Sequence, residues 1–156
     1  MQLSEQSHKH GSVTFTACNQ EGKPLLLKLQ DVVILFEPGV FGGDGTEARK
    51  SICFANVSTS ALQQLTALEE SVGATTSNVK EDMLRCKVNA DRVRMWNAFG
   101  EPAAAPETWR AWQVCVQIQV RGKWETRQGS GLSLEVRDIM FKARQENAQT
   151  CPFTSL

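Results

Sequence analysis

The sequence lacks a net charge, a long apolar run and any cysteine pair with metal-ligand spacing. Seventeen basic residues balance seventeen acidic ones among 156 residues, so no global field attracts a polyanion. No apolar run approaches the roughly 18 residues of a membrane-spanning helix, and the polar start MQLSEQSHKHGS does not resemble a secretory signal. The five cysteines are an odd number without a CxxC motif. We therefore expect an intracellular protein with reduced thiols, no metal and no membrane contact.

The sequence also lacks the common catalytic motifs. It has no Gly-x-Ser-x-Gly, no HExxH and no GxGxxG that opens a helix. The glycine-rich segment FGGDGTEARK (41–50) lacks the Gly-Lys-Ser/Thr ending of a phosphate-binding loop. A cysteine nucleophile needs a base, and the two histidines, His8 and His10, lie in the polar N-terminal stretch. We predict no enzymatic activity, no catalytic residue and no cofactor.

Most of the chain alternates between apolar and polar residues, the period of a half-buried strand. The clearest case is QVCVQIQV (113–120), in which Val114 and every second residue after it are apolar. This pattern is typical of a sheet with one wet face. Further strands are expected at 13–17, 24–30, 51–57, 83–88, 92–97 and 132–141, and RGKW (121–124) reads as a hairpin turn.

One segment, STSALQQLTALEESVG (58–73), has helical spacing. Its apolar residues recur every three positions, with Glu69 on the same face. Ser60 and Gln63 can form a capping box, and Gly73 suits the C-terminal stop. The chain therefore carries one helix among short strands.

Short strands, regular turn signals and one helix predict a mainly β fold, a small OB-like Greek-key barrel with one capping helix. A β-sandwich is the alternative architecture. We expect a flexible N-terminal tail at 1–11, one OB-like domain at 12–141 and a C-terminal tail at 142–156.

Aromatic and basic residues occur together in the second half of the chain. In RVRMWN (92–97), an inward Val93 and Met95 would place Arg92, Arg94 and Trp96 together on the outward face. Bases stack on aromatic planes while cations follow the phosphates, and each stacked base contributes about 1–3 kcal/mol. This combination predicts a surface for single-stranded nucleic acid.

The segments RGKWETR (121–127) and TWRAW (108–112) repeat this pairing of tryptophan with cations. Core packing is the competing interpretation for each tryptophan, because a small barrel needs large residues at its ends. Trp112 is the expected core plug, since it adjoins the apolar run that begins at Val114. The predicted stacking residues are Trp96, Trp124, Phe41, Trp109 and Phe99.

The predicted phosphate contacts come from basic residues near these aromatics: Arg92, Arg94, Arg121, Lys123, Arg127, Arg49 and Lys50. Other cations that could extend the groove are Lys28, Arg85 and Lys87. Acidic residues are expected elsewhere, around Glu69, Glu70, Glu81 and Asp82. A basic face is thus compatible with a neutral chain.

Two long segments, LRCKVNADRVRMWNAFGEPA and WQVCVQIQVRGKWETRQGSGLSLEVRDIMF, resemble OB-fold single-stranded DNA-binding proteins of large DNA viruses and related phage and protist sequences. The matching features are the turn at 97–100, the strand at 114–120, the aromatic Trp124 and the final strand at 129–136. With LFEPGVFGGDGTEARKSICFAN in the front half, the resemblance covers residues 31–141.

The residues and the resemblance together predict a single-stranded DNA-binding protein with little sequence preference, with RNA left open as a ligand. The resemblance implies a role in replication, recombination or repair. The alternative is a β-barrel or sandwich that binds protein, with the tryptophans as interface hot spots. A homodimer is compatible with either prediction.

Overall fold

The computed structural model describes residues 1–9, 11–40 and 49–144, and these form a mainly β structure with one helix. The helix is α1 (Thr59–Ser71). In chain order the strands are β1 (Gln2–Lys9), β2 (Ser12–Cys18), β3 (Leu25–Ile34), β4 (Gly39–Val40), β5 (Arg49–Ala55), β6 (Val79–Lys80), β7 (Met83–Asn89), β8 (Arg94–Trp96), β9 (Trp112–Thr126) and β10 (Gly129–Arg144).

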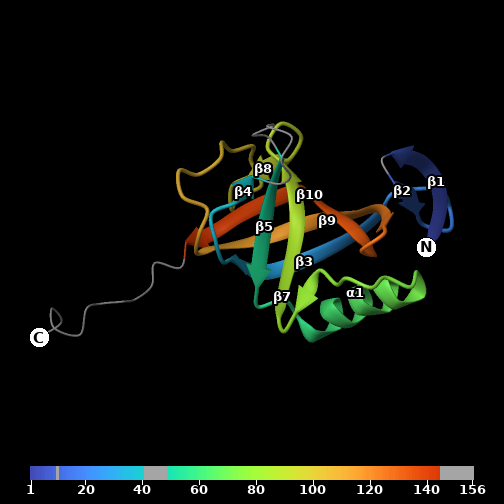
Figure 1. The fold of residues 1–156 in the computed structure, drawn as a ribbon. Coiled ribbons are helices and arrows are strands. Elements are labelled where there is room, and N and C mark those ends of the chain that lie inside the picture. Colours follow the sequence, from blue (N-terminus) through green and yellow to red (C-terminus); the bar gives the residue numbers. More distant parts are fainter. Residues whose placement is uncertain (10, 41–48, 145–156) are drawn as a thin grey trace, which may run out of the picture.

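Five of the strands form a partly closed ring, as shown in Figure 1. β3 pairs with β9 and β5, and β5 pairs with β7, all antiparallel. The long strands β9 and β10 pair along most of their length. The ring closes through a parallel contact between β7 and β10, where Lys87 opposes Glu135. The predicted small OB-like barrel with one helix is confirmed.

The interior of the ring is apolar because alternate residues of each strand point inward. On β9, Val114, Ile118 and Val120 are fully buried, and Val116 is nearly so. Their counterparts on the other ring strands include Leu29, Ile34, Ile52, Phe54, Leu84, Val88, Leu134, Val136 and Ile139. Burial of this face is the main stabilising contribution to the barrel.

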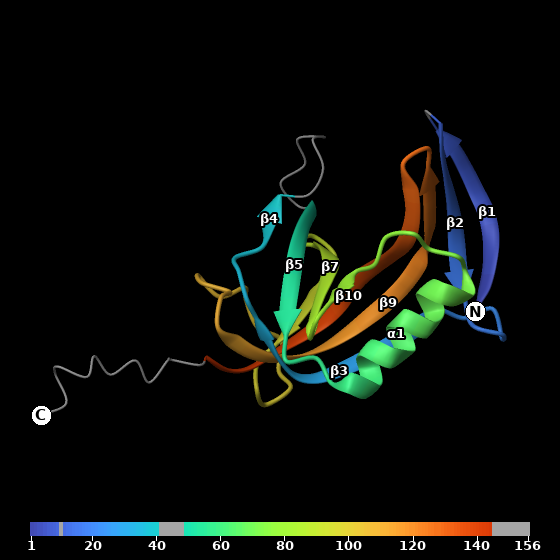
Figure 2. The same ribbon diagram turned by 60° about the horizontal axis from the view of Figure 1, so that its bottom comes forward.

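The helix α1 lies across one end of the barrel, as Figure 2 shows. Its N-cap is Ser58, whose hydroxyl accepts a hydrogen bond from the Ala61 amide, and not the predicted Ser60. Gly73 follows the helix at φ +68°, the left-handed conformation expected at a C-terminal stop. Glu69 is buried on the inner face of the helix. Its carboxylate accepts hydrogen bonds from the Ser77 hydroxyl and the Asn78 amide, which compensate for the loss of water.

The prediction of a flexible tail at 1–11 is wrong for residues 2–9. These residues form β1, which pairs with β2 in an antiparallel hairpin. The segment is too polar for its sequence to predict a strand, but its backbone pairs with β2, and Met1 and Leu3 pack against the core. At the other end, β10 extends to Arg144, so residues 142–144 of the predicted C-terminal tail belong to a strand, and residues 145–156 lie outside the described residues.

The predicted hairpin turn at 121–124 is also wrong, because β9 continues through it to Thr126. Gly122 has a different role there. A Cβ atom at this position would collide with the backbone carbonyl of Phe15, so the glycine lets β2 approach β9 closely. No helix in the described part of the chain has the length and apolar content needed to cross a membrane.

Candidate nucleic-acid interface

Three adjoining hollows cross the outward face of the barrel, and together we call them the outer groove. The β7 hollow is lined by residues of β5, β7, β9 and β10 and by Arg92. The central hollow shares Arg92, Arg121 and Glu135 with it. The Trp96 hollow, at the other end, shares Arg94 with the central hollow. The three hollows therefore form one continuous surface.

The outer groove concentrates positive charge on a chain that is neutral overall. Its lining includes two acidic residues, Glu135 and Asp138. The eight basic residues are Lys28, Arg49, Lys50, Lys87, Arg92, Arg94, Arg121 and Arg137. Such local segregation of charge is what a neutral protein needs to attract a polyanion.

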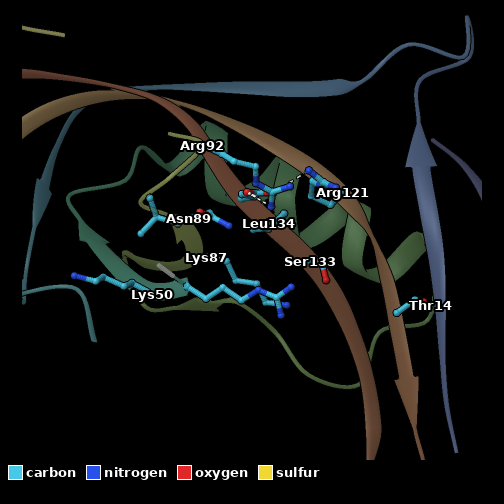
Figure 3. Close-up of a pocket in the computed structure, with 11 residues that line it drawn as sticks. Thr14, Lys50, Lys87, Asn89, Arg92, Arg121, Ser133 and Leu134 are labelled. Atoms are coloured by element: carbon cyan, nitrogen blue, oxygen red, sulfur yellow. Dashed lines mark hydrogen bonds and ion pairs between the residues drawn. The ribbon is translucent and has the colours of Figure 1, made fainter. Parts of the chain in front are cut away.

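Glu135 contacts two of these arginines, Arg92 and Arg121, whose side chains are labelled in Figure 3. Its carboxylate accepts hydrogen bonds from Arg92 at 2.8 Å and from Arg121 at 3.0 Å. The Glu135 side chain is 13% exposed, whereas those of Arg92 and Arg121 are 58% and 46% exposed. The carboxylate thus holds two guanidinium groups that remain accessible from the groove.

Asp138 has the same role at the Trp96 hollow. It pairs with the Arg94 guanidinium at 2.8 Å and accepts a hydrogen bond from the Trp96 indole at 3.2 Å. The indole N–H is the only polar group of a tryptophan side chain, so this bond fixes the ring orientation. One carboxylate therefore positions both an aromatic plane and a cation.

In the β7 hollow, Lys87 lies close to a second cation, Arg49. Burial lowers the pKa of Lys87, the nearby Arg49 lowers it further, and Glu135 acts in the opposite direction. A bound anion would favour the charged form of Lys87 and relieve this crowding. The electrostatics of this hollow therefore suit a phosphate group.

The strand parity predicted for residues 92–97 is confirmed. Val93 is buried and Met95 packs against the core, while Arg92 and Arg94 are exposed. Trp96 is half-buried rather than fully exposed, because Asp138 holds its indole against the sheet. The predicted residues that line the outer groove are Trp96, Arg92, Arg94, Arg121, Arg49 and Lys50.

Trp124 lies on the same face, beyond the β7 hollow. Its registered partners are Thr14 on β2 and Gly131 on β10, and Thr14 lines the β7 hollow. A Cβ atom at Gly131 would lie 2.8 Å from the Trp124 ring, so the indole lies over this glycine. Tryptophans thus flank the outer groove at its two ends.

Lys123 is not in the groove, contrary to the prediction. A β-bulge at Arg121 adds one residue to β9, since Val120 opposes Leu134 and Gly122 opposes Ser133. The bulge reverses the alternation, so the Lys123 side chain points inward and is only 12% exposed. There it pairs with Glu125 at 2.7 Å.

Trp109 packs against the core and not in the groove. Its ring meets Phe141 edge to face at a centroid distance of 5.4 Å, and Trp112 meets the same ring at 5.5 Å. Both tryptophans are half-buried, so Trp112 plugs the barrel end as predicted but is not fully buried. The apolar contact with Phe141 accounts for the position of Trp109 without a ligand.

The remaining predicted residues have different positions. Arg127 lines a separate hollow beside Gly11 and Ser12, away from the outer groove. Phe99 is 87% exposed on a turn that the Asn97 side chain holds by accepting the Phe99 and Glu101 amides. Phe41 lies outside the described residues.

Sequence reasoning missed the groove's two carboxylates and Arg137. It expected acidic residues only around the helix and the following turn. Glu135 has the same parity as the groove residue Ser133, a signal that the alternation of β10 already contains. The pairing of Asp138 with Arg94 and Trp96 has no sequence signal, because it arises from the parallel contact between β8 and β10.

The described residues hold no cluster of histidine, cysteine or carboxylate side chains that could bind a metal ion. The described cysteines, Cys18, Cys53, Cys86 and Cys115, are free thiols. Burial raises the pKa of Cys53 and Cys86, which keeps both thiols protonated near neutral pH.

The fold and the outer groove define a class, OB-like β-barrels with a cationic outer surface. The sequence matches no protein-family model and no curated protein. Among solved structures, the C-terminally truncated single-stranded DNA-binding protein from bacteriophage Enc34 is similar, with a TM-score of 0.57, 14% identity and coverage of 91% of this chain and 95% of that chain. The same phage protein in complex with ssDNA gives a TM-score of 0.52, 15% identity and coverage of 89% and 94%. At such identities the likeness establishes the fold.

Proposed function

We propose that this protein binds single-stranded DNA along the outer groove, with the phosphates on its basic residues and bases on its aromatic rings. The observation that carries the proposal is the continuous groove with eight basic and two acidic residues on a neutral chain. Basic residues on such a surface neutralise the phosphates of a nucleic-acid backbone, which supplies the sequence-independent part of the affinity.

The position of the groove on the barrel supports this function. OB-folds bind oligonucleotides across the face of their second and third strands. Among the five ring strands, taken in chain order from β3, the second and third are β5 and β7. They contribute Arg49, Lys50 and Lys87 to the β7 hollow. The most basic part of the groove thus lies where this fold binds nucleic acid.

The aromatic residues support a single strand over a duplex. Trp96 lines one end of the groove, and Trp124 lies on the same face beyond the other end. Phe99 stands exposed next to Gly100, which lines the Trp96 hollow. Only unpaired bases can stack on such rings. The phage protein whose structure holds ssDNA shares this fold and adds support.

We infer from this ligand that the protein acts inside the cell, where it protects or organises single strands during replication, recombination or repair. It needs no catalytic group or cofactor for that role. Because stacking and phosphate contacts are tolerant of sequence, binding depends little on the DNA sequence.

The test is a titration with oligo-dT, followed by tryptophan fluorescence. We expect quenching at low salt and a loss of affinity of about a hundredfold between roughly 50 and 200 mM salt, if about five phosphates are contacted. The Lys80→Ala variant removes an exposed cation outside the groove and serves as a control that should bind as the wild type does. No quenching at low salt would contradict the proposal and favour the protein-binding alternative.

A further inference from the structure

The Trp96 hollow differs in chemistry from the rest of the outer groove. Registered partners place two rows of side chains side by side on the outward face. The apolar row consists of Cys115, Met140 and Trp96, from β9, β10 and β8. The neighbouring polar row consists of Lys28, Gln117, Asp138 and Arg94, from β3, β9, β10 and β8. Both rows line the hollow.

This arrangement matches the two kinds of surface on a nucleobase. The apolar row offers contact to a flat aromatic face. The polar row presents hydrogen-bonding groups to the edge of a ring that lies on it. The β7 hollow, in contrast, has Arg49, Lys50 and Lys87 in its wall and no aromatic residue.

The hollow is held in shape before any ligand binds. Asp138 accepts a hydrogen bond from the Trp96 indole N–H at 3.2 Å and forms an ion pair with the Arg94 guanidinium at 2.8 Å. The two ligand-facing groups therefore do not have to be ordered by the ligand, which lowers the entropic cost of binding.

We propose that the Trp96 hollow is a base-selective subsite that takes one nucleobase of the bound strand and prefers keto bases, thymine or guanine, over amino bases. This inference rests on the proposed function and adds a local preference to a groove that otherwise contacts phosphates.

The preference follows from the donors in the polar row. Lys28 and Arg94 only donate hydrogen bonds, whereas Gln117 donates through its amide NH₂ and accepts through its Oε1. Asp138, the strongest acceptor of the row, is already engaged by Arg94 and Trp96. Thymine presents an O4 acceptor where cytosine presents an N4 amine. A row rich in donors therefore favours thymine over cytosine.

Gln117 is the residue expected to determine this specificity. It lies in the middle of the polar row, between Lys28 on β3 and Asp138 on β10. Its neighbour Gln119 lies two residues further along the same face of β9 and lines the central hollow instead. The two glutamines form a matched pair, one inside the subsite and one outside it.

The experiment compares oligo-dT with oligo-dC of equal length at one salt concentration, for the wild type, Gln117→Leu and Gln119→Leu. Homopolymers present the same base to the hollow in every binding register. We expect the wild type to prefer dT over dC by about fivefold, at the low end for a hydrogen-bonded base readout. Gln117→Leu should lower this ratio with an unchanged salt dependence, and Gln119→Leu should keep the wild-type ratio.

Equal wild-type affinity for dT and dC would overturn the proposal, and so would an unchanged ratio in Gln117→Leu. A loss of the ratio in both variants would also overturn it, because the effect would not be local. Thermal unfolding of each variant shows whether it is folded. If Gln117→Leu does not fold, Gln117→Asn replaces it in the comparison. Failure of all oligonucleotides to bind at low salt would instead contradict the proposed function itself.

Discussion

The tryptophans at the barrel end and the tryptophan in the outer groove are buried to a similar degree but have different partners. Trp109 and Trp112 place their rings on Phe141, an apolar partner inside the barrel. Trp96 is held by Asp138, a charged partner on the outward face. All three are half-buried. Partner chemistry, and not the burial class, therefore separates the tryptophans that pack at the barrel end from the one that lies in the outer groove.

The largest effect is expected at the barrel end. Phe141→Ala should lower the free energy of unfolding by about 3–5 kcal/mol, because it leaves a cavity beneath both tryptophans. Urea unfolding followed by circular dichroism measures this change. A loss below about 1 kcal/mol would show that the three rings do not act as a structural cluster.

The next effect is expected at the arginine pair of the groove. Replacing both Arg92 and Arg121 by Ala should weaken oligo-dT binding by about tenfold or more and reduce the salt slope by about 1.4, the value for two phosphate contacts to a single strand. Both arginines are exposed, but their loss leaves the largely buried Glu135 carboxylate without these two partners, so thermal unfolding of the variant must show that it is folded at the titration temperature. An unchanged salt slope would exclude these arginines from phosphate contact.

A smaller loss is expected from Trp96→Ala. Removal of one stacking plane should cost about 1–3 kcal/mol of binding free energy at constant salt slope. Trp96→Phe is the matched control, since it keeps an aromatic face and loses only the hydrogen bond to Asp138. If Trp96→Ala unfolds the protein and leaves binding intact in the folded fraction, the comparison of the two kinds of tryptophan fails.

The smallest effect is a gain of affinity from Glu135→Gln. A phosphate about 6 Å from this carboxylate is repelled by about 0.7 kcal/mol at the dielectric constant of water, so its neutralisation should tighten binding about threefold. Fluorescence titrations at matched salt measure the change. Weaker binding would show that Glu135 contributes more by positioning Arg92 and Arg121 than it costs by repulsion.

The local spacing of apolar residues was sufficient to predict several strands and the helix. The parity of 92–97, the strand around Val114 and the helix near 58–73 all follow from periods that neighbouring residues define. Lys123 could not be placed this way, because the bulge at Arg121 reverses the alternation and leaves no sequence signal. The contacts of Asp138 join residues 42 and 44 positions apart, and only the strand order brings them together.

The most direct test of the outer groove is to map where DNA lies. Oligo-dT carrying 5-iododeoxyuridine, bound at low salt and irradiated, should crosslink to the peptide that contains Trp96 or to the one that contains Trp124. Mass spectrometry of the digested complex identifies the site. Crosslinks at these residues, competed away by unlabelled oligo-dT, are the predicted result. Crosslinks confined to Trp109, Trp112 or the helix α1 would contradict binding in the groove.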